Sequence, residues 1–300
     1  MLTGSPRISV IIPTYNRGEL LIRTVNHFLE LLSGDDELVI IDQSDTPSPI
    51  LLEMQITNRQ LTYLHIKEKG LPNARNVGVQ HASGKIILFC DDDTIPQPGL
   101  INAHVRAYDD PTIGAVAGRV ILHGTQPCSD SAFGTIRQAD FRIIGHFSSM
   151  ERKRVDHFQG CNFSVSRQVF HQGVLSDKRF GGTAHLEESD LALQITEKGF
   201  RILFEPEAAL VHLIQAGGGC RMPDMGRWLY WYGHNYMLLQ LKHGRRVFLP
   251  FFVLVRLTKL FLTAVTAKNP GLLVKGVQGL IDGGISYFGQ RETVSQVNEP

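Results

Sequence analysis

The stretch KIILFCDDDTIPQPG, residues 85–99, places three adjacent aspartates directly after a run of apolar residues. A short apolar run that ends in turn-forming residues predicts a buried strand, with Asp91, Asp92 and Asp93 at its carboxyl end. Adjacent carboxylates at the end of a buried segment repel one another unless a cation or hydrogen-bond donors compensate them. The stretch therefore predicts positive charge close to the three aspartates.

The sequence before this stretch alternates short apolar runs with helical patterns. We predict strands at 8–12, 37–41, 61–66 and 85–90. We predict helices at 20–32, after Pro49, and from Pro72 to near Gly84. Continuous apolar strands separated by helices are typical of a parallel sheet covered on both faces, which binds ligands beyond the carboxyl ends of its strands. The predicted fold class is α/β, with a Rossmann-like, mostly parallel central sheet.

Polar groups follow two other predicted strands at the same edge. The first strand ends in PTYNR, residues 13–17, and the second in DQSD, residues 42–45. Taken singly, Asn16 would cap the following helix and Asp42 would start a turn, since these residue types favour both positions. Their recurrence at three strand ends, the aspartate cluster included, instead favours a binding site.

The aspartates suit a hard divalent cation. Mg²⁺ and Mn²⁺ prefer oxygen ligands, and Mg²⁺ usually takes one or two carboxylates and completes its shell with water and substrate phosphates. A metal-bound diphosphate fits such a site. The alternative is a solvated acidic turn with no ligand.

Bulk features restrict the remaining choices. A chain of 300 residues, 43% hydrophobic and 20% charged, can bury one large core or two smaller ones. The four cysteines are far apart and form no zinc-site spacing, and the N-terminus lacks a signal-peptide pattern, so we expect reduced thiols and a catalytic part inside the cell. No P-loop sequence and no Ser-His-Asp arrangement is seen, which leaves ATP hydrolysis and acyl transfer without support.

Several stretches together resemble a known family. They are SVIIPTYNR, VIIDQSD, GLPNARNVGVQHASGKIILFCDDDTIPQPGLI, GCNFSVSRQVF and FGGTAHLEESDLALQITEKGFRILFEPEAALVHL. In this order, from about Ile8 to His212, they resemble the inverting family 2 glycosyltransferases of the GT-A fold, of the rhamnosyltransferase-like type that builds bacterial surface glycans. The resemblance implies a nucleotide-diphospho-sugar donor and a divalent cation, Mn²⁺ or Mg²⁺.

The resemblance also implies roles for the strand-end residues. The family's D-x-D signature matches the three aspartates, with Asp93 as principal metal ligand and Asp91 and Asp92 near the ribose and diphosphate. Asp91 is a second metal ligand, and His212 matches a histidine that contacts metal or diphosphate in relatives. The donor-binding positions map onto Pro13, Thr14, Tyr15, Asn16, Arg17, Asp42 and Arg75. For Arg75, a purely structural role on its helix is the alternative.

The segment HLEESDLALQI resembles the family's E-D-x-D block. Its second acid is the catalytic base in the family, which is Glu188 here, with Glu187 in reserve and Asp190 on the acceptor side. A sugar hydroxyl is a poor nucleophile, and a carboxylate within reach can take its proton during attack. The alternative is that these acids simply favour the positive end of a helix that begins here.

The C-terminal part has a different surface. Between Arg221 and Lys275 there are nine lysines and arginines against one acid, a formal charge of +8, whereas the whole chain carries +1. Residues 247–267 are apolar but contain Arg256 and Lys259, and each central cation costs about 2.5–3.5 kcal/mol on insertion scales. We therefore expect a helix that lies in the membrane interface with these cations toward anionic head groups. The alternatives are a buried helix or an oligomer contact.

These observations predict a donor-binding half at 1–120, an acceptor half at 121–215 and a helical tail at 216–300. The predicted protein is a metal-dependent inverting glycosyltransferase at the cytoplasmic face of the cell membrane. It would act on a glycan or lipid-linked acceptor in polysaccharide biosynthesis. We expect no nucleic-acid partner, and an oligomer formed through the C-terminal helices is an open alternative. The alternatives are a non-catalytic membrane-tethered nucleotide-sugar-binding protein and a metal-dependent phosphohydrolase.

Overall fold

The computed structural model describes residues 7–122, 131–213 and 222–297, with side chains up to residue 289. The chain divides into two compact units. The first comprises the described parts of Met1–Thr135, Ile144–Ser176 and Leu191–Gly219, and the second those of Ile136–Ile143, Asp177–Asp190 and Cys220–Pro300. Two of the cysteines, Cys90 and Cys161, are buried free thiols, and the other two lie outside the described residues.

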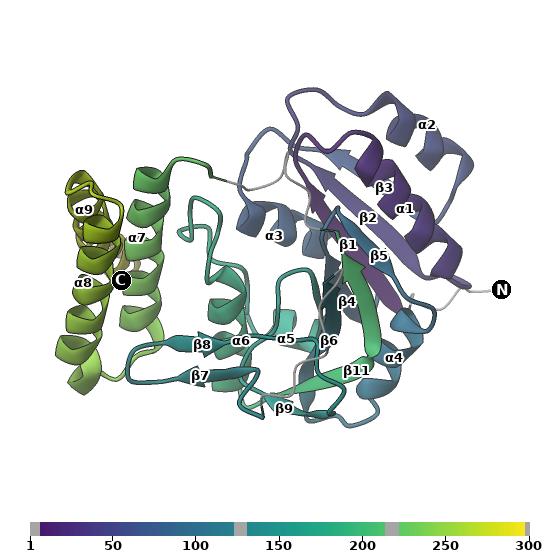
Figure 1. Cartoon of the computed structure of the whole chain (residues 1–300). Coiled ribbons are helices and arrows are strands. Elements are labelled where there is room, and N and C mark those ends of the chain that lie inside the picture. Colours follow the sequence, from purple (N-terminus) through teal and green to yellow (C-terminus); the bar gives the residue numbers. More distant parts are fainter. Residues whose placement is uncertain (1–6, 123–130, 214–221, 298–300) are drawn as a thin grey trace. The chain divides into compact units, whose positions relative to one another are not determined.

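The predicted strands and helices of the first part of the chain are confirmed within a few residues. They form the order β1 Ile8–Thr14, α1 Glu19–Leu31, β2 Glu37–Asp42, α2 Pro49–Thr57, β3 Leu61–His65, α3 Leu71–His81 and β4 Ile86–Cys90. Strands β1 to β4 pair in parallel, with β1 between β2 and β4. Helices α1 and α2 lie on one side of these strands and α3 on the other (Figure 1), because the chain reverses its direction across the sheet after β3 and parallel crossovers are right-handed.

The remaining elements of the first unit extend the same sheet. They are β5 Thr94–Pro96, α4 Leu100–Ala107, β6 Ile113–Leu122, β9 Lys153–Val155, β10 Asn162–Ser166, α5 Arg167–His171 and β11 Arg201–His212. The sheet has nine strands in the order β3-β2-β1-β4-β10-β6-β11-β5, with β9 also on β11. Strands β10, β5 and β9 run against the other six, so the α/β fold with a mostly parallel sheet is confirmed.

The pairing of β5 with β11 decides where the site lies. β5 begins immediately after the three aspartates and pairs antiparallel with the end of β11, which aligns Thr94 with His212. The backbone N–H of Leu213 also donates to the carbonyl oxygen of Asp93 at 2.9 Å. A histidine more than a hundred residues away in the chain is thereby held beside the aspartates.

The second unit is mainly helical. It contains α7 Met225–His243, a 3₁₀ turn η1 at Arg246–Phe248, α8 Leu249–Thr266 and α9 Gly271–Val297. Helix α6 Glu187–Glu197 begins in this unit, and the short strands β7 Thr135–Arg137 and β8 Arg142–Ile144 form a separate two-stranded sheet. Glycines let α7 and α9 approach closely: a Cβ on Gly279 would collide with the backbone of Tyr230, and one on Gly283 with the backbone of His234.

Helix α8 confirms the predicted apolar helix, but one of its cations is not where we expected it. The buried positions Phe252, Arg256, Leu260 and Ala264 recur every fourth residue and form one stripe. Arg256 is 4% exposed, lies 3.7 Å from the ring centre of Tyr236 and donates to the Tyr232 hydroxyl at 2.5 Å. The expectation that Arg256 faces lipid head groups is therefore wrong, because aromatic rings and an oxygen acceptor within the unit already compensate its charge.

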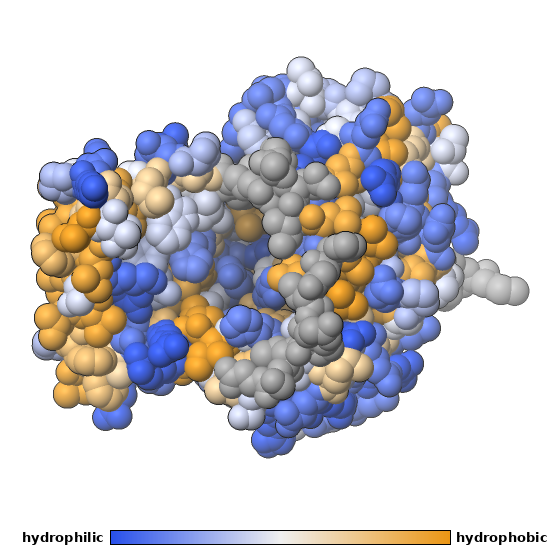
Figure 2. Space-filling model, in the orientation of Figure 1, coloured by the Kyte–Doolittle hydropathy of each residue, from blue (hydrophilic) through white to orange (hydrophobic). Residues whose placement is uncertain are grey.

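The face of α8 opposite this stripe is apolar and exposed. Figure 2 shows hydrophobic surface gathered over α8 and α9. The exposed apolar side chains there include Val247, Phe251, Leu254, Leu257, Phe261, Leu262, Val265, Val274, Ile281, Ile285 and Phe288. In the part of the chain that the structure describes, Arg246–Thr266 is the one helical stretch that passes a membrane-span test of length and composition.

Candidate active site

The three adjacent aspartates point in different directions at the carboxyl end of β4. Asp92 is 4% exposed and accepts a hydrogen bond of 2.7 Å from the Thr14 hydroxyl at the end of β1. Its backbone carbonyl and that of Thr94 both accept from the hydroxyl of Thr24 on α1, at 3.0 and 3.2 Å. Asp92 therefore faces the interior and anchors the loop, whereas its two neighbours are left for other contacts.

The predicted positive charge is Arg17, in the turn after β1. Its Nε lies 2.9 Å from Asp92 Oδ1, and its Nη2 lies 3.2 Å from Asp93 Oδ2. Burial raises the pKa of Asp92 to about 7, although Arg17 and the Thr14 hydrogen bond oppose that rise. Arg17 thus bridges two of the three carboxylates, and the expected compensation of their repulsion is present.

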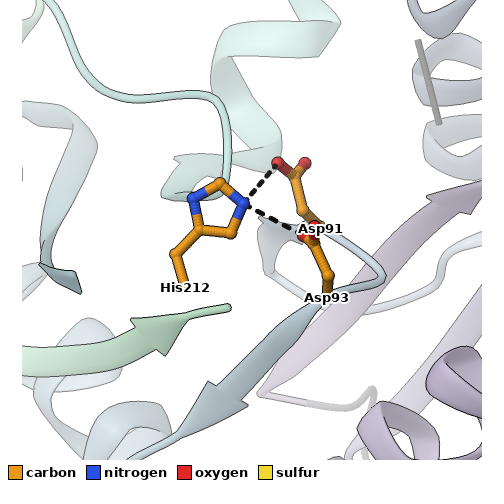
Figure 3. Close-up of side chains that lie close together, drawn as sticks. All are labelled: Asp91, Asp93 and His212. Atoms are coloured by element: carbon orange, nitrogen blue, oxygen red, sulfur yellow. Dashed lines mark hydrogen bonds and ion pairs between the residues drawn. The ribbon is translucent and has the colours of Figure 1, made fainter. Parts of the chain in front are cut away.

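Asp91, Asp93 and His212 form a group that could hold a metal ion (Figure 3). The His212 Nε2 lies 3.0 Å from Asp93 Oδ1 and 4.0 Å from Asp91 Oδ2, and the three ligand atoms all lie within 4.8 Å of one another. Opposite ligands of one Mg²⁺ are about 4.2 Å apart, so a small inward shift would suffice. Two carboxylates and one imidazole fit Mn²⁺ or Mg²⁺ with several positions left for water and phosphate.

The burial of the group favours a cation. Asp93 is 2% exposed and Asp91 36% at the side chain, so the group opens on the side of Asp91. Burial disfavours the charged ring of His212, but the hydrogen bond and charge of Asp93, with Asp91, outweigh it and raise the pKa of His212. Carboxylates that raise the pKa of a neighbouring imidazole favour positive charge at that position. A divalent cation carries more positive charge than a protonated imidazole, so the same carboxylates favour a cation there.

The ends of β1 and β2 lie side by side, as predicted. Asp42 is 2% exposed; its Oδ2 accepts from the Tyr63 hydroxyl at 2.7 Å and its Oδ1 from the backbone N–H of Ser44 at 2.8 Å. Asn16 has a left-handed backbone, with φ of 52°, and its N–H donates to the Ser44 hydroxyl at 2.8 Å. Asn, with its short polar side chain, is among the residues that tolerate this conformation.

Tyr15 and Pro13 complete the first strand end in different ways. The Tyr15 side chain is partly exposed, and Lys69 lies 4.7 Å from its ring centre and donates to its hydroxyl at 3.2 Å. Pro13 is buried within β1 and aligned with Ile41 of β2. Tyr15 is therefore on the rim where a ligand could reach it, whereas Pro13 is part of the sheet beneath.

Arg75 of α3 is 2% exposed, and its guanidinium lies 5.1 Å from the ring centre of Phe163. Its Nη2 donates to the carbonyl oxygen of Gly160 at 2.9 Å. Partial burial raises the pKa of Asp91, and the charge of Arg75 is the largest of those that oppose this rise. Arg75 thus has the structural contacts named as its alternative role and also acts electrostatically on the metal group.

The acids of α6 belong to the second unit. Glu187 is fully buried and Glu188 is partly exposed. Asp190 is also fully buried, and its Oδ1 lies 2.6 Å from Lys242 Nζ and 2.8 Å from His243 Nε2 at the end of α7. These contacts favour a positioning role for Asp190, and its place on the acceptor side stays a prediction. Among the three acids, Glu188 is the one with an accessible side chain.

The turn before Glu187 is held by α7. Ala184 and Leu186 both have left-handed backbones, with φ of 56° and 75°, a conformation that is strained for a bulky residue such as leucine. Asn235, which is fully buried, donates its Nδ2 to the carbonyl oxygens of Gly181 at 3.1 Å and His185 at 2.9 Å. Strained backbone of this kind persists only where the surroundings over-determine it.

Three residues with evident roles escaped the sequence-based prediction. Tyr63 holds Asp42, Thr24 holds the aspartate loop, and Asn235 holds the turn before the candidate base. In the sequence, Tyr63 and Thr24 are ordinary residues of a predicted strand and a predicted helix, and Asn235 lies within a helical pattern rich in aromatic residues. None carries a motif, so only the folded contacts reveal them.

Comparison with known proteins agrees with this geometry. A protein of Campylobacter jejuni named GalNAc(5)-diNAcBac-PP-undecaprenol beta-1,3-glucosyltransferase is 27% identical over 202 residues, which are 66% of this chain and 62% of that protein. This chain thus spans less than two thirds of that relative. The structure of Staphylococcus aureus TarS with UDP-GlcNAc matches 92% of this chain and 80% of its own, at a TM-score of 0.65 and 13% identity.

A third comparison covers nearly the whole chain. The mannosyltransferase PcManGT of Pyrobaculum calidifontis, solved with GDP-Man and Mn²⁺, matches 98% of this chain and 81% of its own, at a TM-score of 0.57 and 18% identity. Identities this low show a shared fold. The family model described as glycosyl transferase family 2 matches residues 9–172, which include β1 to β4, the aspartates and β10. Since that match covers more than half of the chain, this chain belongs to glycosyl transferase family 2.

Proposed function

We propose that this protein is a metal-dependent, inverting glycosyltransferase that moves a sugar from a nucleotide-diphospho-sugar to an acceptor hydroxyl. The observation that carries the proposal is the group of Asp91, Asp93 and His212 at the carboxyl end of β4. Family membership and the neighbours solved with UDP-GlcNAc or with GDP-Man and Mn²⁺ support a nucleotide-sugar donor. Asp91, whose side chain is 36% exposed, would face the diphosphate of the donor.

Each group of candidate residues would have a separate role in the reaction. Asp91, Asp93 and His212 would hold Mn²⁺ or Mg²⁺, which when bound would neutralise charge that develops on the diphosphate leaving group. Glu188 would accept the proton of the acceptor hydroxyl as its oxygen attacks the anomeric carbon. The bond from that carbon to the diphosphate breaks, and the nucleoside diphosphate leaves with the electron pair. Attack from the face opposite the leaving group inverts the configuration.

The donor's other contacts would come from the ends of β1 and β2. Thr14, Asn16 and Asp42 line that edge of the sheet, and Tyr15 offers a partly exposed ring. Arg17 already binds two of the aspartates, so its part is to keep them ionised and oriented. Arg75, buried against aromatic rings, would act on the diphosphate through its charge.

The exposed apolar face of α8 and α9 supports peripheral association with a membrane, at its cytoplasmic side. The stripe of α8 that contains Arg256 packs within the second unit, which favours a helix that lies on the bilayer over one that crosses it. A lipid-linked or growing surface glycan would then be the acceptor. The name of the Campylobacter relative, which contains a PP-undecaprenol acceptor, supports this choice.

A thermal-shift screen tests the donor and metal assignments together. We expect one of UDP, GDP, dTDP and CMP, or its sugar conjugate, to raise the melting temperature only in the presence of Mn²⁺ or Mg²⁺, because a ligand that binds only the native state stabilises it. Equal stabilisation after chelation would exclude the metal role. Release of inorganic phosphate instead of a nucleoside diphosphate would support a phosphohydrolase, and binding without transfer to any acceptor a non-catalytic protein.

A further inference from the structure

A surface groove runs along α8 in the second unit. Its volume is about 690 Å³, within the usual range of small-molecule sites, and its lining includes Met225 of α7 and Leu254, Val255 and Leu262 of α8. The polar members of the lining are three threonines and Lys259. No carboxylate lines it among the residues that the structure describes. The groove thus combines a long apolar wall with a single positive charge.

Lys259 stands at the aromatic border of this groove. Its Nζ lies 4.9 Å from the ring centre of Tyr232, and that ring stacks on Trp228 at 5.3 Å between centroids. The ring of His185 also stacks on Tyr232, with 6.3 Å between the ring centroids. Burial, followed by the charges of Lys259 and Arg256, lowers the pKa of His185 to about 4, so the ring is neutral at pH 7.

The aromatic cluster connects the groove with the candidate base. His185 stands three residues before Glu188, in the strained turn that Asn235 holds. Tyr232 contacts both His185 and Lys259, so a group bound at Lys259 is one aromatic ring away from that turn. A ligand that filled the groove with an apolar chain and placed an anion at Lys259 would therefore hold that anion beside the aromatic cluster that contacts the turn before Glu188.

We propose that this groove binds the hydrocarbon chain of a lipid phosphate or diphosphate, with the phosphate at Lys259, and that this lipid is the carrier of the acceptor glycan. The proposal rests on the glycosyltransferase function proposed above. Two observations favour a single lipid chain over the bilayer as a whole. The groove shares Leu254 and Leu262 with the exposed apolar face, but Phe261, Val265, Ile281 and Ile285 do not line it, and its one charge complements a phosphate.

The test uses full-length protein and farnesyl diphosphate, a soluble single-chain diphosphate, in isothermal titration calorimetry. Farnesol and inorganic diphosphate are the separate halves of the probe. We expect farnesyl diphosphate to bind at least about tenfold more tightly than either half, since it uses both the wall and the cation. Leu262→Trp should fill the groove and abolish binding, whereas Ile281→Trp, at a similarly exposed position outside the groove, should not.

The charge is tested by a second matched pair. Lys259→Glu should weaken farnesyl diphosphate binding at least about tenfold, and Arg245→Glu, an equal change of charge at an exposed position outside the lining, should leave it near wild type. Equal effects of the two variants would reduce the role of Lys259 to general attraction by a basic tail. If Leu262→Trp instead changed only binding to phosphatidylglycerol vesicles or only the oligomeric state, bilayer lipid or a second copy would be the occupant.

Measurement of nucleotide binding in the same variants distinguishes failure of this inference from failure of the proposed glycosyltransferase function on which it rests. Each variant is also assayed for the Mn²⁺-dependent thermal shift with nucleotide. Loss of farnesyl diphosphate binding in Leu262→Trp and Lys259→Glu with an unchanged nucleotide shift supports the groove. A nucleotide shift in a wild-type protein that never binds the lipid probe would overturn the groove and leave the glycosyltransferase proposal intact. Lipid binding without any nucleotide-dependent thermal shift would overturn the glycosyltransferase proposal and leave the groove intact.

Discussion

Asp91, Asp92 and Asp93 are chemically identical, yet each has a different environment. Asp92 and Asp93 lie in the turn between β4 and β5; Asp92 contacts Thr14 and Arg17, whereas Asp91 and Asp93 lie close to His212. The exposure of the side chains differs as well, since Asp93 is buried and Asp91 is more exposed. Adjacent carboxylates are tolerable here because each of the two buried ones has its own compensating partners.

Substitution of Asp93, the proposed principal metal ligand, should affect ground-state binding. We expect Asp93→Asn to weaken metal-dependent nucleotide binding by more than the 10- to 100-fold that loss of a mere ligand-supporting contact causes. Titration of Mn²⁺ against the nucleotide-dependent thermal shift measures this. Asp109→Asn, which removes an exposed carboxylate after α4, is the control and should behave as wild type. Unchanged Mn²⁺ dependence in Asp93→Asn would remove Asp93 from the metal site.

Substitution of Glu188, the proposed base, should affect turnover instead. We expect Glu188→Gln to lower kcat about 10²- to 10⁴-fold and to leave nucleotide binding near wild type, because a base acts mainly as the proton moves. Glu187→Gln is the comparison, since that residue is buried beside it. A larger loss of kcat in Glu187→Gln, at an unchanged nucleotide shift, would transfer the role of base to Glu187.

Sequence motifs predicted the candidate ligand-binding residues better than the residues that support them. The aspartates, Arg17 and His212 were named from strand ends and family blocks, and the fold brings them together. Tyr63 and Asp42 are 21 residues apart in the chain, and Asn235 and Gly181 are 54 apart. Such contacts depend on how elements pack, and neither residue type nor spacing encodes them.

At the scale of elements, β10 and β5 show what periodicity leaves open. NFSVS has the same alternation in either direction, so the sequence does not reveal that β10 runs antiparallel between β4 and β6. β5 has only three residues, too few for a pattern, although it is the strand that brings His212 to the aspartates. Strand direction and pairing come from the connections around the sheet.

The turn before α6 should respond to its clamp on α7. Asn235→Ala removes the donor of two part-buried hydrogen bonds to backbone carbonyls, which we expect to lower the free energy of unfolding by about 1–3 kcal/mol. If Asn235 positions Glu188, kcat should fall while KM for the donor stays within about twofold. Gln240→Ala removes another buried amide of the same helix and should not lower kcat. A parallel loss in both variants would make Asn235 a purely structural residue.

The ion pairs at the other end of α7 should make stability depend on pH. Asp177 lies 2.6 Å from Arg179 and 2.7 Å from Lys242. Burial would raise the pKa of Asp177, but its bonds to Arg179 and Lys242 outweigh burial and lower it well below the usual range. A lowered folded-state pKa contributes stability above the unfolded value of about 3.9, and this contribution is lost as the pH falls toward the folded value.

We therefore expect Asp177→Asn to destabilise the protein at pH 7 by about 1.5–3 kcal/mol, with a difference from wild type that shrinks below about pH 4. Urea unfolding between pH 3 and pH 8 measures this difference. Asp109→Asn should show no such pH-dependent gap. A constant difference across the range would mean that packing, rather than charge, explains the effect.

At the scale of the whole molecule, the apolar face of the C-terminal helices should determine where the protein resides. We expect wild type to sediment with vesicles that contain phosphatidylglycerol, partly even at high salt, because salt screens the basic tail but not apolar contact. Replacement of Phe261, Val265, Ile281 and Ile285 by glutamine should lower the bound fraction at least about tenfold. Ile56→Gln, at an exposed position of α2, is the control.

The same sedimentation experiment, with a measurement of oligomeric state, also detects the alternative role of this face as an oligomer contact. If wild type stays in solution with these vesicles and forms an oligomer that the four glutamines dissociate, the face is a contact between copies of the chain. Removal of the helices by truncation would not distinguish these cases, because α9 packs against α7 through glycines and its loss would expose that surface.

Helix α8 has one guanidinium in a buried stripe that is otherwise apolar, and leucine, phenylalanine and valine also cover its outer side. In an ordinary surface helix, replacing apolar residues with polar ones damages the core. Here the outward apolar positions can take polar residues at little cost to folding, whereas Arg256→Leu would leave the backbone oxygen of Asp140 and the hydroxyl of Tyr232 without their donor. The outer side of the helix can therefore be made polar without loss of the contacts that its buried stripe makes.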